Sequence, residues 1–207
     1  MKAILFDLGG VLIDLEPSRV FEHWARVASV TSPSLAARWE IDEAYKSHEE
    51  GRLEFVEFTQ HLGKQLGISI PQNDWQMGWN ALLGQPFPQL LSRLAELSQR
   101  IPLFCYSNTN QTHWASLEAR TNHRQLVSFF KKIYLSFAIG RRKPDVESYQ
   151  WVADDMGYQP ADITFLDDNV ANIDGAERAG FRTQHVTEPE VVIDFLDALL
   201  ASNSGVS

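Results

Sequence analysis

Four short polar motifs carry the residues whose types and spacing could do chemistry. Each follows an apolar run or lies in the loop after one, and they read Asp7-Leu8-Gly9-Gly10, Ser107-Asn108-Thr109, Gly140-Arg141-Arg142-Lys143-Pro144 and Asp167-Asp168-Asn169. Their carboxylates are suited to a divalent cation, whereas the hydroxyl, the free amides of a helix start and the lysine are suited to phosphate oxygens. If the fold brings these motifs together, they could hold a phosphoryl group beside a metal ion.

Each motif alone also has a purely structural interpretation. The Ser107 motif could cap the helix that follows it, Lys143 could be a solvated loop lysine, and Asp7 could be an acid at a strand-to-turn junction. Asp167 and Asp168 are harder to explain in this way, because adjacent acids at the end of an apolar strand repel each other and a cation is their natural compensation. Four such motifs at one sheet therefore favour a functional site.

The elements that must position these motifs alternate along the chain. Strands are predicted at residues 2–7, 102–106, 132–136, 163–166 and 182–186. A helix that ends near Arg100 is predicted after Pro86, and further helices are predicted at 109–120, 145–156, 170–179 and 188–200, followed by a frayed tail at 201–207. Such alternation predicts a parallel sheet with helices on both faces, and ligands of such sheets bind at the carboxyl ends of the strands.

Residues 16–84 interrupt the alternation. Four helices with one apolar stripe each are predicted, and they open at Pro17-Ser18, at Ser32-Pro33 (running through Tyr45), after Gly51 and at Pro71, with Gly84 as the final stop. The stripes indicate a small antiparallel bundle. We therefore expect a Rossmann-like α/β core at residues 1–15 and 85–207 with an inserted helical cap at residues 16–84.

Composition excludes several other classes of protein. A chain of 207 residues with 44% hydrophobic residues can bury a core, and its 18 basic against 27 acidic residues give a net charge of −9, which disfavours nucleic-acid binding. No run approaches the roughly 20 apolar residues of a membrane-spanning helix, and Met1 leads into KAILFD without a targeting signal. With one cysteine, a cytoplasmic protein without nucleic-acid or membrane partners is expected.

Taken together, the motifs resemble those of the haloacid dehalogenase-like hydrolase superfamily. FDLGGVLID, YSNTN, RRKP and FLDDNVANIDGA are similar to its four motifs in order, and the helical insertion resembles its small cap. DLG, HEEG in the cap, YSNTN and LDDN most resemble the branch of bacterial α-D-glucose-1-phosphate phosphatases and the phosphatase half of soluble epoxide hydrolase. The resemblance implies a magnesium-dependent phosphatase acting on a small phosphorylated metabolite, such as a sugar phosphate.

The resemblance also implies roles for individual residues. Asp7 is expected to be the nucleophile that forms an aspartyl-phosphate, and Lys143 to neutralise the phosphoryl charge and orient Asp7. Ser107, Asn108 and His48 are expected to bind substrate along with Lys143. Carboxylate and phosphate are both anionic, and cations are therefore required to cancel their repulsion during attack.

Magnesium is expected at the same edge of the sheet. By resemblance, its ligands are Asp7, the Gly9 carbonyl and Asp168, with Asp167 in or beside the ligand set. Oxygen ligands of this kind suit magnesium or manganese rather than zinc.

One position departs from the pattern of most phosphatases in this superfamily. They carry a second Asp two residues after the nucleophile, which protonates the leaving oxygen, and here that residue is Gly9. The glucose-1-phosphate phosphatases share the difference, so activity is still expected. Tyr45, His48, Glu49 or a water molecule are alternative proton donors that the sequence does not rank.

Two other functions remain open at the level of sequence. A 2-haloacid dehalogenase uses the same Asp nucleophile without a metal, and the Asp167-Asp168 pair argues against it. A phosphate-accepting regulatory module with little turnover is conceivable because Gly9 removes an acid, although such a module has no need of a helical lid.

Overall fold

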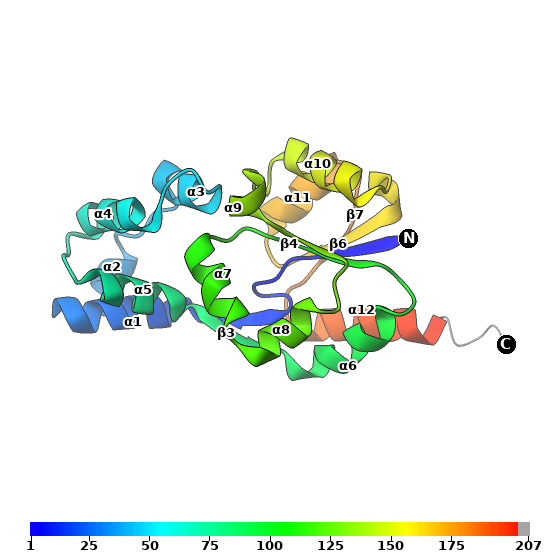
Figure 1. Cartoon of the computed structure of the whole chain (residues 1–207), viewed down its shortest axis with the longest axis horizontal. Coiled ribbons are helices and arrows are strands. Elements are labelled where there is room, and N and C mark those ends of the chain that lie inside the picture. Colours follow the sequence, from blue (N-terminus) through cyan, green and yellow to red (C-terminus); the bar gives the residue numbers. More distant parts are fainter. Residues whose placement is uncertain (203–207) are drawn as a thin grey trace.

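The computed structural model describes residues 1–202 and is built around a five-stranded parallel sheet (Figure 1). The strand order is β5-β4-β1-β6-β7. The strands are β1 (Ala3–Phe6), β4 (Leu103–Ser107), β5 (Lys132–Leu135), β6 (Ile163–Asp167) and β7 (Arg182–His185). All neighbouring strands pair in parallel. The α/β fold class predicted from the alternating pattern is confirmed.

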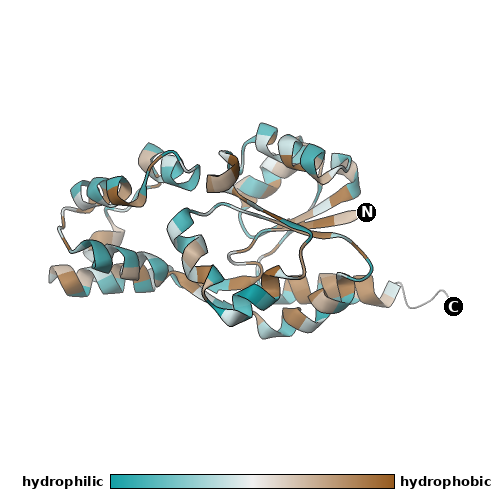
Figure 2. Cartoon of the chain, in the orientation of Figure 1, coloured by the Kyte–Doolittle hydropathy of each residue, from teal (hydrophilic) through white to brown (hydrophobic). Residues whose placement is uncertain are grey.

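Helices cover both faces of the sheet, as the buried apolar strands require. One face carries α6 (Pro88–Leu97), α7 (Gln111–Glu118), α8 (Thr121–Val127) and α12 (Pro189–Ser202), and the other carries α10 (Val146–Met156) and α11 (Val170–Arg178). Within β1, Ile4 and Phe6 belong to the first apolar core, whereas Ala3 and Leu5 belong to the second. This two-residue period explains why the run is apolar at every position. Figure 2 shows the hydrophobic strands lying between the helical layers.

Five helices form a separate group to one side of the sheet (Figure 1). They are α1 (Pro17–Ala28), α2 (Ser32–Ala36), α3 (Glu43–Glu49), α4 (Phe55–Leu66) and α5 (Gln72–Asn80). Their apolar stripes meet in a core of their own that includes Trp24, Phe58 and Trp79. Trp24 and Trp79 stack nearly parallel, with ring centroids 6.1 Å apart.

The helix predicted from Ser32 through Tyr45 is two helices, so that prediction was wrong in its connectivity. α2 ends at Ala36, and α3 begins again at Glu43. The cause is Asp42, whose carboxylate accepts a hydrogen bond from the Tyr45 amide at 3.0 Å and thereby caps a new helix.

Two short strands were missed. β2 (Ile13–Leu15) precedes α1, β3 (Leu83–Pro86) follows α5, and they pair antiparallel. Gly84, predicted as a helix stop, lies within β3, where a Cβ atom would approach the Asp14 carbonyl oxygen to 2.6 Å. β2 has too few residues to show a two-residue period, and β3 contains Gly84 and Pro86, which are turn signals.

The remaining elements are short. α9 (Ser136–Ile139) follows β5 directly, and a 3₁₀ turn, η1 (Pro160–Asp162), precedes β6. α12 continues to Ser202, so the first two residues of the predicted tail are helical, and residues 203–207 lie outside the described part of the chain. Among residues 1–202, no helix is long and apolar enough to cross a membrane.

Candidate active site

The predicted site residues of the α/β core gather at the carboxyl ends of three neighbouring strands. Asp7 follows β1, Ser107 ends β4 and Asp167 ends β6. β1 pairs with both β4 and β6, so the three ends meet at one edge. Lys143 reaches the same edge from the loop between α9 and α10.

Lys143 lies between two carboxylates beneath the surface. Its ammonium group is 2.9 Å from an Asp7 oxygen and 2.6 Å from an Asp167 oxygen, and the residue is 1% exposed. Burial alone would lower the pKa of Lys143, but the charges of Asp167 and Asp7 outweigh it and raise that pKa above its ordinary value. Lys143 therefore stays cationic next to Asp7.

Asp167 is held on every side. One oxygen accepts hydrogen bonds from the Asn169 amide at 2.8 Å and the Asn172 side chain at 3.0 Å. The other accepts from Lys143 at 2.6 Å and from Asn172 at 3.1 Å. Asp167 is fully buried, so in this arrangement its carboxylate fixes Lys143 in place.

Three carboxyl groups lie close together in the site. Ligand oxygens of Asp7, Asp167 and Asp168 all lie within 4.8 Å of one another. Burial raises the pKa of Asp7 to about 7, against the opposing effect of Lys143 and with further help from Asp167 and Asp168. Burial and Asp167 likewise raise the pKa of Asp168.

This cluster fits a divalent cation. The carboxylate of Asp168 approaches the Asp7 loop so closely that a Cβ atom on Gly10 would lie 2.4 Å from its oxygen. Gly10 also has a left-handed φ of 73°, which favours glycine. Oxygen ligands crowded in this way repel one another unless a cation lies among them, and hard cations such as magnesium prefer such ligands.

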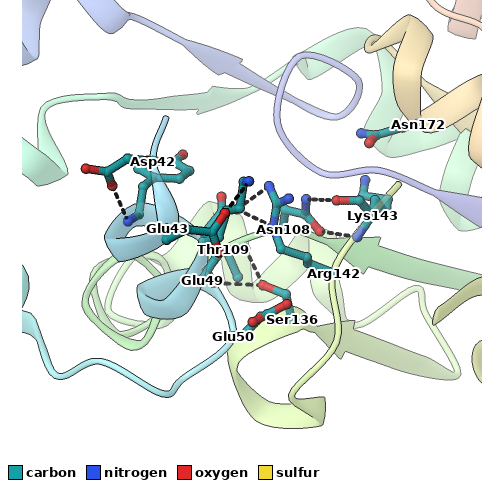
Figure 3. Close-up of polar contacts among 12 residues, drawn as sticks. Asp42, Glu43, Glu49, Glu50, Asn108, Thr109, Ser136, Arg142, Lys143 and Asn172 are labelled. Atoms are coloured by element: carbon teal, nitrogen blue, oxygen red, sulfur yellow. Dashed lines mark hydrogen bonds and ion pairs between the residues drawn. The ribbon is translucent and has the colours of Figure 1, made fainter. Parts of the chain in front are cut away.

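Two pairs of reciprocal hydrogen bonds tie the loop after β4 to its neighbours (Figure 3). The Asn108 side chain donates to the Lys143 carbonyl and accepts from the Lys143 amide, both at 2.9 Å. The Ser136 hydroxyl accepts from the Thr109 amide at 2.8 Å and donates to the Thr109 carbonyl at 2.9 Å. The Asn108 side chain thus positions the Lys143 backbone.

A cavity of about 290 Å³ opens above these residues. Predicted site residues in its wall are Asp7, Gly9, Ser107, Asn108, Lys143 and Asp168. Asp167 is absent from the wall because it lies beneath Lys143. The opposite wall comes from the helical group, through Ile41, Tyr45 and Glu49.

His48 is not brought to the cavity. Its ring stacks on Phe58 with centroids 4.4 Å apart, and its Nδ1 lies 2.8 Å from the Leu53 carbonyl oxygen. Helix α3 has one face toward the cavity and one toward the aromatic core, and His48 lies on the second. Of the alternative proton donors considered from sequence, Tyr45 and Glu49 border the cavity.

An ion pair between the helical group and the sheet edge was missed from sequence. Arg142 donates to one Glu49 oxygen from Nη2 at 2.8 Å and from Nε at 3.1 Å (Figure 3). Both side chains line the cavity, and Glu49 is 5% exposed. RRKP and HEEG are both recognisable motifs, but no sequence signal links residues that lie 93 positions apart.

Leu15 occupies the space beside Gly9. A Cβ atom on Gly9 would lie 2.7 Å from Leu15 Cδ1. Gly9 is not among the residues with a left-handed φ, so side-chain packing rather than backbone conformation restricts this position. Leu15 also lines the cavity.

Comparison with known proteins shows which family this chain is similar to. A family model described as haloacid dehalogenase-like hydrolase matches residues 1–180. The D-ribitol-5-phosphate phosphatase of Bacteroides thetaiotaomicron is 25% identical over 186 residues, which cover 88% of this chain and 90% of that protein.

Two solved structures extend the similarity to three dimensions. A predicted haloacid dehalogenase-like hydrolase from Porphyromonas gingivalis superposes with a TM-score of 0.82 at 27% identity, covering 97% of this chain and 98% of that one. An enzyme of this family from Bacteroides thetaiotaomicron, crystallised with magnesium and inorganic phosphate, superposes with a TM-score of 0.78 at 27% identity, covering 89% and 93%.

Proposed function

The chain belongs to the haloacid dehalogenase-like hydrolase family and is a phosphoric monoester hydrolase, and we propose that it is magnesium-dependent and acts on small sugar or polyol phosphates. Two candidates are tested first. Glucose 1-phosphate follows from the resemblance of the sequence motifs, and ribitol 5-phosphate from the name of the Bacteroides relative.

The observation that carries the proposal is Lys143 between Asp7 and Asp167 at the base of the cavity. An Asp7 oxygen attacks phosphorus, the bond from phosphorus to the leaving oxygen breaks, and that oxygen takes up a proton. Water then cleaves the resulting aspartyl-phosphate to phosphate and free Asp7. Lys143 would lower the cost of bringing the two anions together, while Ser107 and the backbone amide of Asn108 would bind phosphoryl oxygens.

Magnesium is proposed to be held by Asp7, Asp168 and the Gly9 carbonyl. When bound, it supplies the positive charge that cancels repulsion between carboxylate and phosphate. Asp167 is proposed to act beside this set by fixing Lys143, because its oxygens already accept hydrogen bonds from Lys143, Asn169 and Asn172.

The division of the chain is part of the same proposal. Residues 1–15 and 85–207 would form the catalytic core, and residues 16–84 a cap that excludes water and contacts the leaving group. The helical group has its own apolar core and supplies one wall of the cavity, which supports this division. A cavity of about 290 Å³ is suited to a small metabolite rather than a polymer.

Phosphate release from glucose 1-phosphate and ribitol 5-phosphate, with and without a chelator, tests the proposal. We expect turnover with magnesium and none after chelation. Halide release from 2-chloropropionate in the presence of chelator would instead support the dehalogenase alternative. Stoichiometric labelling of Asp7 without turnover would support the regulatory alternative.

A further inference from the structure

We infer that Glu49, held by Arg142 and Tyr45, is a specificity-determining residue that accepts hydrogen bonds from hydroxyl groups of the leaving group. The inference rests on the proposed phosphatase function. It adds a subsite for a hydroxylated carbon skeleton on the cap side of the cavity.

Geometry places Glu49 opposite the reacting groups. Glu49 and Tyr45 from α3 line the same cavity as Asp7 and Lys143. The ester substituent of a phosphoryl group bound at Asp7 and Lys143 would occupy the same cavity, within which Glu49 is part of the wall.

Glu49 retains hydrogen-bonding capacity in this position. An ionised carboxylate offers about four lone-pair sites. Arg142 uses two of them through Nε and Nη2, both on one oxygen, and the Tyr45 hydroxyl hydrogen-bonds to the same carboxylate. An acceptor site remains for a donor in the cavity, and sugar or polyol hydroxyls are such donors.

The charge balance favours a neutral hydroxylated group over a charged one. Arg142 compensates the carboxylate, so the buried pair adds no net charge to the cavity wall. A purely apolar leaving group would remove water from the pair without replacing its hydrogen bonds, which is unfavourable. A hydroxylated group replaces them.

An adjoining apolar cavity suits the carbon skeleton of such a group. It measures about 260 Å³ and shares Leu15, Tyr45 and Leu82 with the catalytic cavity. Phe21, Trp39 and Trp79 also line it. Ligand sites commonly combine apolar walls with a few fixed polar groups, and the C–H faces and hydroxyls of a sugar or polyol match that combination.

A purely structural role is the competing explanation. The Glu49–Arg142 pair joins α3 to the residue before Lys143, so it could merely hold the two parts of the chain together. Such a role would affect every substrate alike, whereas hydroxyl recognition affects only substrates that carry hydroxyls. The two explanations therefore predict different effects on the ratio of kcat/KM for a hydroxylated ester to kcat/KM for an ester without hydroxyl groups.

The experiment compares kcat/KM for glucose 1-phosphate and phenyl phosphate in the wild type and in Glu49→Gln, with magnesium present. Gln keeps the shape and can still accept from Arg142. We expect a loss of roughly 10- to 100-fold on glucose 1-phosphate, the effect of losing one hydrogen bond to a charged group, and a change under about threefold on phenyl phosphate. Using the same two esters in both proteins cancels their different leaving-group reactivity.

Glu50→Gln is the matched control. Glu50 does not line the cavity and pairs with Arg52. Its substitution should therefore leave the ratio of kcat/KM for glucose 1-phosphate to kcat/KM for phenyl phosphate unchanged. If Glu49→Gln fails to fold, Tyr45→Phe tests the same subsite and should lower the ratio in the same direction.

Equal losses on both esters would overturn the inference and leave the phosphatase function intact. The inference would also be overturned if Glu49→Gln and the wild type had the same kcat/KM for glucose 1-phosphate. A wild type that hydrolyses neither ester, nor ribitol 5-phosphate, with magnesium would overturn the proposed function and the inference with it.

Discussion

Gly9→Asp restores the carboxylate that most phosphatases of this superfamily carry, and the structure predicts what opposes it. A Cβ atom at position 9 would overlap Leu15 Cδ1 at 2.7 Å, whereas the backbone φ there is not left-handed. The conflict is therefore overpacking against β2, which typically costs about 1–3 kcal/mol. We expect Gly9→Asp to lower the free energy of unfolding by that amount in urea or thermal denaturation.

Shortening Leu15 should relieve the conflict. In the double variant Gly9→Asp/Leu15→Ala, the loss of stability should be smaller than the sum of the two single losses, because Leu15→Ala removes the side-chain atoms that a Cβ atom at position 9 would overlap. With room for its carboxyl group, Asp at position 9 can protonate the leaving oxygen. A positioned general acid contributes about 10²–10⁴-fold, mainly for poor leaving groups.

The assay is phosphate release from an alkyl phosphate and from an aryl phosphate by the wild type, both single variants and the double variant. The alkyl ester should gain more than the aryl ester in the double variant, with Leu15→Ala alone as the control. Additive stability losses would refute the packing argument. A wild-type rate that is independent of leaving-group pKa, with phosphoryl transfer rate-limiting, would show that another acid already acts.

Three further predictions concern the carboxylates. Asp7→Asn should keep the fold, since the amide is isosteric, and abolish phosphate release; residual activity within about tenfold of the wild type would contradict a covalent mechanism. Asp168→Ala should weaken magnesium affinity measured by calorimetry while leaving the far-UV circular dichroism spectrum unchanged, and unaltered affinity would place the metal elsewhere. Because the pKa of Asp7 is raised from 3.8 to about 7 on folding, the folded state binds the extra proton, and metal-free stability should fall as pH rises across that interval. Melting temperatures of the wild type and Asp7→Asn, compared from pH 4.5 to 7.5, isolate this effect, and an identical pH dependence in both would rule it out.

The three central strands β1, β4 and β6 could be predicted because they are mainly apolar runs that end at polar motifs, and the edge strands β5 and β7 could be predicted from the alternation of strands and helices. The run before Asp7 has no polar position, and in the structure β1 is buried on both faces. The limits of the predicted core strands and helices differ from the observed ones mostly by one or two residues, whereas the short helices α8 and α9 were not predicted. Local sequence was sufficient because burial on both faces leaves few alternatives for such a segment.

The cap side of the site could not be predicted, because it depends on contacts between distant segments. Asp42 caps the start of α3, and within α3 Tyr45 and Glu49 line the cavity while His48 stacks on Phe58. The helical period alone left these three residues equivalent candidates. Their separation follows from the three-dimensional position of α3 against the sheet.

The two acidic residues at the end of β6 need compensation of their charge, as expected from the sequence, but the source of that compensation differs between them. Asp167 is the last residue of β6, and Asp168 lies just beyond the strand, so the two carboxylates differ in burial although their oxygens lie within 4.8 Å of each other. Asp167 turns inward, where Lys143 and Asn172 compensate its charge, whereas Asp168 is exposed at the cavity wall. From the sequence, one cation was expected to compensate the negative charges of both Asp167 and Asp168. In the structure, Lys143 compensates Asp167, and the proposed magnesium ion would compensate Asp168. Asp167→Asn should accordingly disturb the position of Lys143 before it disturbs metal binding, whereas Asp168→Ala should do the reverse.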